Sequence, residues 1–137
     1  MRVLNFEDSP IKHSAIRDVL ESCRITEIDR AKYLDDGIEM YKKAIAEGRK
    51  YDLIITDMLY PRSRGMNEEK SGDVLVGIAT EEKWDTPILI CSNQNYSYPE
   101  ILGCLYFSEN VDWEGQLRNY VSKIRSGEKS SSSKGQS

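Results

Sequence analysis

The chain has 137 residues, the length of one domain with a substantial buried core. Its formal net charge of −4 argues against a general surface for nucleic acid or anionic membranes, because both favour an excess of Lys and Arg. No apolar run approaches the ~20 residues of a membrane span and no signal-peptide layout precedes the first strand pattern, so we expect a cytoplasmic protein without direct nucleic-acid or membrane partners.

The first predicted element is a short apolar strand over residues 2–6, which ends at the acidic pair Glu7 and Asp8. Ser9 is a predicted helix N-cap, and the proline that follows it suits the first turn of a helix. His13 has no nearby acid or cysteine and is expected at the surface. Helical spacing predicts an inner face made of Ile11, Ala15, Ile16, Val19, Leu20 and Cys23.

Residues 24–31 predict a second strand, and their polarity is typical of a sheet edge. Asp36, followed by Glu39 three residues later, predicts a capping box at the start of a second helix. Gly48 is the expected end of that helix. Its predicted inner face consists of Ile38, Tyr41, Ala44 and Ile45.

Residues 51–61, YDLIITDMLYP, contain a continuous apolar run that predicts a strand buried on both faces of a parallel sheet. The run stops at Asp57, at the end of the strand where open α/β sheets carry their chemistry. Taken alone, Asp57 could equally cap the following segment. If the first and third strands are parallel neighbours, however, Glu7, Asp8 and Asp57 come together, and such a cluster needs a cation.

Residues 62–70 are charged, mixed in sign and without periodicity, which predicts an inserted loop. Ser71 is a predicted cap for a third helix, and a fourth buried strand is expected over residues 88–90, ahead of Cys91, Ser92 and Asn93. The predicted inner face of the third helix consists of Val74, Leu75, Ile78 and Ala79.

The segment between Ser92 and the predicted fifth strand at residues 105–108 is short, so we expect only one or two helical turns there. Asp112 is a predicted cap for the last helix, and the polar residues 127–137 are expected to form a disordered tail after a single domain over residues 1–126. The predicted inner face of the last helix consists of Trp113, Leu117, Tyr120, Val121 and Ile124.

The alternation of strands and helices predicts an α/β fold with a parallel sheet, right-handed crossovers and helices on both faces. The three cysteines, Cys23, Cys91 and Cys104, form no CxxC pair and are expected to be buried or half-buried free thiols.

Three motifs, VLNFEDSP, YDLIITDMLYP and PILICSN, occur in an order that resembles the receiver domain of two-component response regulators over about residues 1–126. The resemblance implies a flavodoxin-like doubly wound five-stranded parallel sheet of order 2-1-3-4-5, a (βα)5 fold with a shortened fourth helix. It also implies Mg²⁺ as cofactor. Asp8 and Asp57 would be side-chain ligands, Glu7 would act mainly through water, and the backbone carbonyl of Leu59 would be a third protein ligand.

The same resemblance implies that Asp57 accepts a phosphoryl group from a histidine kinase or phosphotransfer protein. Ser92 would contact that group, and Tyr106 would be the aromatic that changes orientation with phosphorylation; an ordinary strand-ending Ser and a half-buried strand Tyr are the alternatives. The family Lys is absent, because Ser108 occupies its position and cannot neutralise a phosphoryl charge. The inserted loop offers three candidates for that charge, namely Arg62, Arg64 and Lys70.

Three functions remain open. The first is an atypical single-domain receiver, a phosphoacceptor rather than an ordinary enzyme, that signals by contact with an unknown output protein. The second is a degenerate receiver that binds proteins independently of phosphorylation, since the Lys is missing. The third, a small Mg²⁺-dependent phosphohydrolase, needs a second Asp close to Asp57, but Met58, Leu59 and Tyr60 follow instead.

Partner recognition, including a possible homodimer, is expected on the surface made by residues 93–104, the fifth strand and the last helix. Tyr96, Tyr98 and Tyr106 lie in or beside this segment, and Tyr offers a large, rigid contact area with a polar end. Alternatively, these side chains fold inward and cover core that the short fourth helix leaves open.

Overall fold

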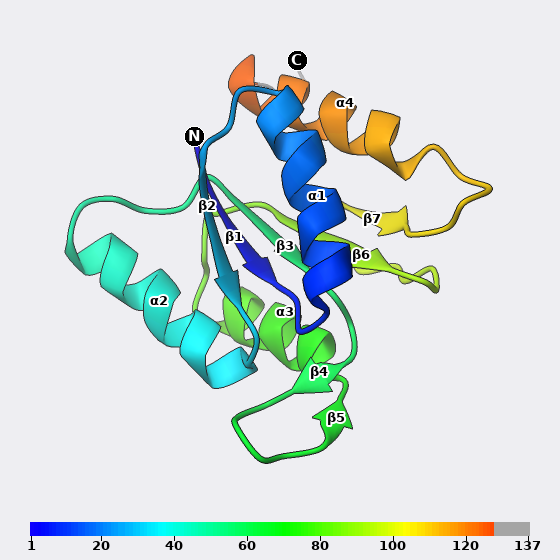
Figure 1. The fold of residues 1–137 in the computed structure, drawn as a ribbon. Coiled ribbons are helices and arrows are strands. Elements are labelled where there is room, and N and C mark those ends of the chain that lie inside the picture. Colours follow the sequence, from blue (N-terminus) through cyan, green and yellow to red (C-terminus); the bar gives the residue numbers. More distant parts are fainter. Residues whose placement is uncertain (128–137) are drawn as a thin grey trace.

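The computed structural model describes residues 1–127, so the tail expected over residues 127–137 lies outside the described part except for its first residue. Five parallel strands form the central sheet in the order β2-β1-β3-β6-β7 (Figure 1). This is the predicted order 2-1-3-4-5 of a flavodoxin-like sheet, with the polar β2 at one edge as expected. The strands are β1 (Arg2–Phe6), β2 (Glu27–Ala31), β3 (Leu53–Thr56), β6 (Ile88–Ser92) and β7 (Gly103–Tyr106).

Within residues 1–127, four helices cover the two faces of this sheet (Figure 1). Helices α1 (Pro10–Ser22) and α4 (Trp113–Arg125) pack on one face, and α2 (Leu34–Ala46) and α3 (Ser71–Glu81) pack on the other. Successive strand residues alternate between the two cores, so that Leu53 and Ile55 face α1 and α4 whereas Ile54 faces α2 and α3. All three are fully buried, as the apolar run predicted.

Two of the predicted helix caps are confirmed and two are wrong. The Ser9 hydroxyl accepts a hydrogen bond from the backbone N–H of Lys12, and Asp112 caps α4 by accepting from Gly115. Helix α2 begins earlier than predicted, after Tyr33, which places Asp36 in the first turn rather than at the cap. Ser71 is the first residue of α3, not its cap.

The predicted inner faces of α1 and α2 each contain an error. Ile11 is 83% exposed, and the buried row of α1 instead contains Lys12. Ile45 of α2 is 50% exposed, whereas Leu34 and Gly37 face the sheet. The buried row of α1 reads Lys12, Ile16, Val19 and Leu20.

The predicted inserted loop is an antiparallel hairpin of β4 (Tyr60–Pro61) and β5 (Glu68–Glu69), which projects from the sheet beside the start of α3 (Figure 1). Between β6 and β7, residues 93–102 contain no helix, so the one or two helical turns expected there are wrong. Strand β7 starts two residues before the predicted fifth strand and ends at Tyr106.

Among the described residues, no helix is long and apolar enough to cross a membrane. The three cysteines are free thiols, with Cys91 buried and Cys23 and Cys104 half-buried, as predicted.

Candidate functional site

Three acids meet at the carboxyl ends of β1 and β3. The two strands are parallel neighbours, and Phe6 pairs with Thr56, so the residues that follow each strand lie side by side. Glu7, Asp8 and Asp57 each place a carboxylate oxygen within 4.8 Å of the others. The predicted cluster of carboxylates is therefore present.

Backbone hydrogen bonds hold these acids in place. Arg30 of β2 donates from Nε to the carbonyl of Glu7 and from Nη2 to the carbonyl of Asp8, both at 2.9 Å. The backbone N–H of Ser9 donates to Glu7 Oε2 at 3.2 Å, and that of Met58 donates to Asp57 Oδ1 at 2.7 Å. The carboxylates of Glu7 and Asp57 and the backbone of Asp8 therefore have defined positions.

Hydrogen bonds from α3 and from the β4–β5 hairpin hold the turn after β3. The Thr56 hydroxyl donates to the carbonyl of Asp57 at 2.7 Å and lies 2.9 Å from the hydroxyl of the buried Tyr60. Gly72 donates its N–H to the carbonyl of Met58, and a Cβ at Gly72 would lie 2.4 Å from the Asp57 carbonyl oxygen. The absence of a side chain at Gly72 thus permits α3 to begin against the Asp57 turn.

A lysine that the sequence pattern missed lies inside the cluster. Lys12 Nζ is 3.3 Å from Glu7 Oε1 and 3.2 Å from Asp57 Oδ1, and it donates to the carbonyl of Cys91 at 2.5 Å. Lys12 is only 9% exposed, although it is a charged residue on a helix. The sequence does contain one indication of this contact: Lys12 is next to the predicted inner residue Ile11, on a helix that directly follows the acidic pair Glu7 and Asp8.

Burial and charge oppose one another at this cluster. Burial raises the pKa of Glu7 to about 7, against the lowering effect of Lys12. Burial acts to lower the pKa of Lys12, but the charges of Glu7 and Asp57 together raise it, so Lys12 stays protonated. Cys91 takes no part as a thiolate, because burial raises its pKa to about 12.

The donor set fits a hard divalent cation. Glu7 is 1% exposed, and its Oε1 has an ion pair with Lys12 but no hydrogen bond within the described chain, so this buried oxygen can still bind a metal or its water shell. Carboxylate and carbonyl oxygens are the ligands that Mg²⁺ prefers. Leu59, the predicted carbonyl ligand, lies in the same turn as Asp57 and exposes its side chain.

The remaining predicted site residues also lie at or after the carboxyl ends of the strands. Ser92 ends β6 and is buried, and its hydroxyl accepts from the N–H of Gln94 at 3.4 Å. Tyr106 pairs with Ser92 and is half-buried at the end of β7. Ser108 lies beyond β7, where its hydroxyl accepts from the N–H of Asn110.

The two arginines of the hairpin do not reach this site. Arg62 Nε lies 3.9 Å from Asp35 Oδ1, and the Arg64 guanidinium lies over the Tyr33 ring, both at the start of α2. The hairpin instead presents Glu68, whose pKa is raised by partial burial and then by the charge of Asp8. Of the three candidate cations of the inserted loop, Arg62 and Arg64 therefore point away from the acids.

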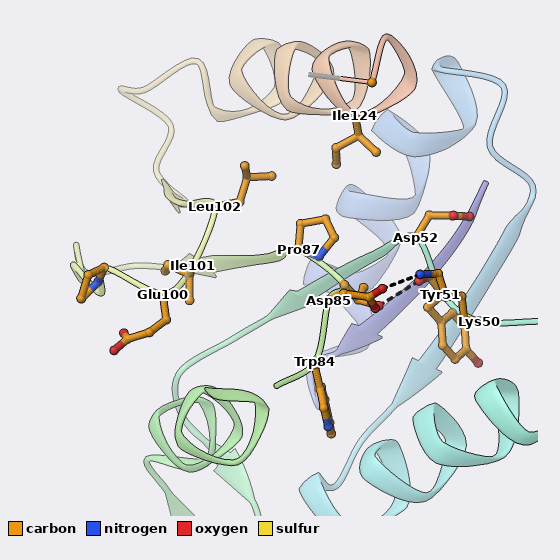
Figure 2. A pocket seen from close by; sticks show the side chains of 13 residues that line it. Lys50, Tyr51, Asp52, Trp84, Asp85, Pro87, Glu100, Ile101, Leu102 and Ile124 are labelled. Atoms are coloured by element: carbon orange, nitrogen blue, oxygen red, sulfur yellow. Dashed lines mark hydrogen bonds and ion pairs between the residues drawn. The ribbon is translucent and has the colours of Figure 1, made fainter. Parts of the chain in front are cut away.

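A separate hollow lies at the opposite, amino-terminal end of the central strands. It measures about 700 Å³ and is lined by residues that precede β3 and β6, among them Trp84 and Pro87, and by Leu102 and Ile124 (Figure 2). Lys50 Nζ lies 2.9 Å from Asp85 Oδ2 in its wall. None of the clustered acids lines this hollow, so it is separate from the candidate site.

No protein-family model matches the sequence, and no curated protein matches it significantly. Solved structures, however, share the fold. The response regulator TrrA from Thermotoga maritima, in complex with Mg²⁺ and beryllium fluoride, is 23% identical, and the match covers 90% of this chain and 97% of that chain with a TM-score of 0.65.

Two further solved structures with this fold come from a chemotaxis protein and from a histidine kinase. The chemotaxis protein CheY4 from Vibrio cholerae is 18% identical, with 88% of this chain and 96% of that chain covered and a TM-score of 0.61. The receiver domain of the histidine kinase CKI1 from Arabidopsis thaliana, complexed with Mg²⁺ and BeF₃⁻, is 16% identical, with 91% and 89% covered and a TM-score of 0.60. The chain has the fold of response-regulator receiver domains.

Proposed function

We propose that this chain is a single-domain receiver that accepts a phosphoryl group on Asp57 and signals by contact with another protein. The observation that carries the proposal is the position of Asp57 at the carboxyl end of β3, beside Glu7, Asp8 and the ammonium of Lys12. A carboxylate so placed can act as a nucleophile toward phosphorus if the charge of the incoming group is neutralised.

The chemical step forms one bond and breaks another. A carboxylate oxygen of Asp57 bonds to phosphorus while the phosphorus–nitrogen bond of a donor phosphohistidine breaks, and the released imidazole nitrogen takes up a proton from solvent. The product is an acyl phosphate on Asp57. Asp57 Oδ1 already accepts from Met58 N–H, so Oδ2 is the oxygen left to attack.

Mg²⁺ would be held by Asp8, Asp57 and the carbonyl of Leu59, with Glu7 acting through water, and would supply charge neutralisation at the phosphoryl oxygens. Ser92, at the end of β6, would donate its hydroxyl to one of those oxygens, and Tyr106 would reorient in response. Arg30 keeps the Glu7 and Asp8 backbone in place throughout.

A histidine kinase or phosphotransfer protein is the proposed donor. TrrA has been solved in complex with the histidine kinase ThkA, and this similar fold supports a donor of the same kind here. The output protein would bind the surface made by residues 93–104, β7 and α4, either as a heterologous partner or as a second copy of the chain.

One observation favours a second function, that of a binding module independent of phosphorylation. Lys12 already pairs with both Glu7 and Asp57, so the cluster is partly neutralised without a metal, and Ser108 replaces the family Lys. In that case neither Mg²⁺ nor a phosphodonor changes the protein.

Intact mass spectrometry after incubation with acetyl phosphate, with and without Mg²⁺, tests the proposal. We expect the mass of one phosphoryl group to be added only with Mg²⁺, and Asp57→Asn to abolish the addition. Asp18→Asn, on the exposed side of α1, is the matched control and should behave as wild type. An unchanged wild-type mass with this donor and with a panel of kinases would support the binding module instead.

A further inference from the structure

Lys12 is buried where an apolar residue would ordinarily stand. It shares the inner row of α1 with Ile16, Val19 and Leu20, four to eight residues farther along the helix. A buried ammonium is costly unless it is paired and hydrogen-bonded. A charge kept at this position therefore needs partners, and the structure supplies them.

The Lys12 ammonium is at the point where the ends of the central strands converge. Its contacts are Glu7 after β1, Asp57 after β3, and the carbonyl of Cys91 in β6, at 3.3, 3.2 and 2.5 Å. It also lies 5.3 Å from the centroid of the Phe107 ring, in the residue directly after β7. Lys12 thus reaches, from α1, the end of the sheet at which β7 also ends.

The arginines near the site make their contacts elsewhere. Arg30 binds the carbonyls of Glu7 and Asp8, and Arg62 and Arg64 lie against the start of α2. In the part of the chain that the structure describes, Lys12 is the one basic side chain with an ion pair to Asp57. Ser108 carries no charge that could take this role.

We infer that Lys12, presented by α1 rather than by the segment after β7, is the residue that neutralises and binds the phosphoryl group on Asp57. This inference rests on the proposed function. The ammonium would keep its hydrogen bond to the Cys91 carbonyl and exchange its contact with Asp57 Oδ1 for one with a phosphoryl oxygen. Because one charge takes the place of another, a receiver can lack the Lys after its fifth strand and still accept a phosphoryl group.

The experiment measures two affinities by calorimetry, one for Mg²⁺ alone and one for beryllofluoride in saturating Mg²⁺, and adds the acetyl phosphate mass assay. The first variant, Lys12→Gln, removes the positive charge but keeps a hydrogen-bond donor. The double variant Lys12→Gln/Ser108→Lys restores a positive charge from the segment after β7. Lys43→Gln, an exposed lysine of α2, is the matched control. If Lys12→Gln does not fold, Lys12→Met fills the same buried row with apolar atoms.

Lys12→Gln should weaken beryllofluoride binding about ten- to a hundredfold, the equivalent of one charge-assisted hydrogen bond. Mg²⁺ binding should be unchanged or tighter, because a positive charge leaves the metal site. The double variant should regain beryllofluoride affinity, whereas Ser108→Lys alone should add little to wild type.

Equal beryllofluoride affinity in wild type and Lys12→Gln would overturn the inference and leave the proposed function intact. Equal losses in Mg²⁺ and beryllofluoride affinity would overturn it as well, because Lys12 would then only shape the site. A wild-type protein with neither beryllofluoride binding nor a mass increase would overturn the proposed function and the inference together.

Discussion

Lys12 is both a buried residue of α1 and a charged residue of the acidic site. As part of the inner row of α1 it must be buried, and as a charge it must be paired, which ties the helix to Glu7 and Asp57. Charge pairs of this kind are seldom a net gain over apolar packing, but removing one partner leaves the other uncompensated. The stability of the site should therefore depend on which cation is present.

Without Mg²⁺, Lys12→Gln should lower the free energy of unfolding by roughly 1.5–3 kcal/mol, since two carboxylates lose their cation. Uptake of a proton by Glu7, whose pKa is already about 7, limits the loss. Mg²⁺ should then stabilise Lys12→Gln more than it stabilises wild type, as measured by urea unfolding with and without the metal. Equal stabilisation of both proteins would show that Lys12 and the metal do not share the same acids.

His13 gives a pH-dependent contribution that the sequence pattern did not predict. It is half-buried, not at the surface, and its Nδ1 lies 2.7 Å from the Oδ1 of the buried Asn5. Burial, and then the charges of Arg30 and Arg17, lower the pKa of His13 below its ordinary value of 6.5. The unfolded state thus binds the proton more readily, and the stabilising contribution is complete above 6.5 and lost as the pH falls below it.

Replacing His13 with Gln should remove this term while keeping a donor for Asn5. Between about pH 8 and about pH 5, wild type should lose more free energy of unfolding than His13→Gln does. The comparison cancels Glu7, which titrates in the same range in both proteins. Parallel pH profiles would show that His13 keeps its ordinary pKa.

At the scale of the element, the start of α3 determines the shape of the Asp57 turn. Gly72 lies so close to that turn that a Cβ would be 2.4 Å from the Asp57 carbonyl oxygen and 2.9 Å from the Met58 Cα, both backbone atoms that cannot rotate away. Gly77, in the same helix, is exposed and has no atom within 4 Å of its Cβ position. Substituting Ala at Gly77 therefore tests helix propensity alone, whereas the same substitution at Gly72 also tests the contact with the Asp57 turn.

Gly77→Ala should stabilise the protein by up to about 1 kcal/mol, because Ala favours the helix. Gly72→Ala should instead destabilise it by roughly 1–3 kcal/mol, since the overlap forces the backbone to shift. Gly72→Ala should also slow phosphorylation of Asp57, with chemical denaturation and the mass assay as the measurements. Stabilisation of both variants would mean that α3 can move away from the turn at no cost.

The elements themselves were largely predictable, and the errors have physical causes. The apolar run of β3 and the caps at Ser9 and Asp112 depend on local chemistry, which is legible in the sequence. The burial of Lys12 in place of Ile11 depends on its ion pairs with Glu7 and Asp57, which follow β1 and β3, and the hydrophobic periodicity of α1 does not report such pairs. The β4–β5 hairpin depends on pairing across a charged segment, which hydrophobic spacing does not report.

The same division applies to the site. Glu7, Asp8 and Asp57 could be brought together from the sequence because each directly follows a strand, and adjacent parallel strands end at one edge. The directions of Arg62 and Arg64 could not be predicted, because long side chains on a loop have no register to follow. The sequence therefore indicates the acids better than it indicates their cation.

For the whole molecule, the main departure from a fully wound α/β sheet is the missing helix between β6 and β7. Residues 99–102 of this segment line the hollow of Figure 2 together with the residues that directly precede β3 and β6. Tyr96 and Tyr98 are both half-buried in this segment, but only the Tyr98 hydroxyl reaches another element, donating to Asp73 Oδ1 of α3 at 2.7 Å. Tyr96 donates to the nearby Gln94 side chain instead.

This difference assigns separate roles to the two tyrosines, one structural and one for recognition. Tyr98→Ala should lower the free energy of unfolding by about 1 kcal/mol or more, because it removes a half-buried aromatic side chain and a hydrogen bond that connects residues 93–102 to α3. Tyr96→Ala should leave the melting temperature nearly unchanged and weaken association with the output protein or with a second copy of the chain. Sedimentation of each variant with Mg²⁺ and beryllofluoride, paired with thermal unfolding, measures both effects. A large loss of stability in Tyr96→Ala with association retained would make both tyrosines structural, and the partner surface would then have to lie elsewhere.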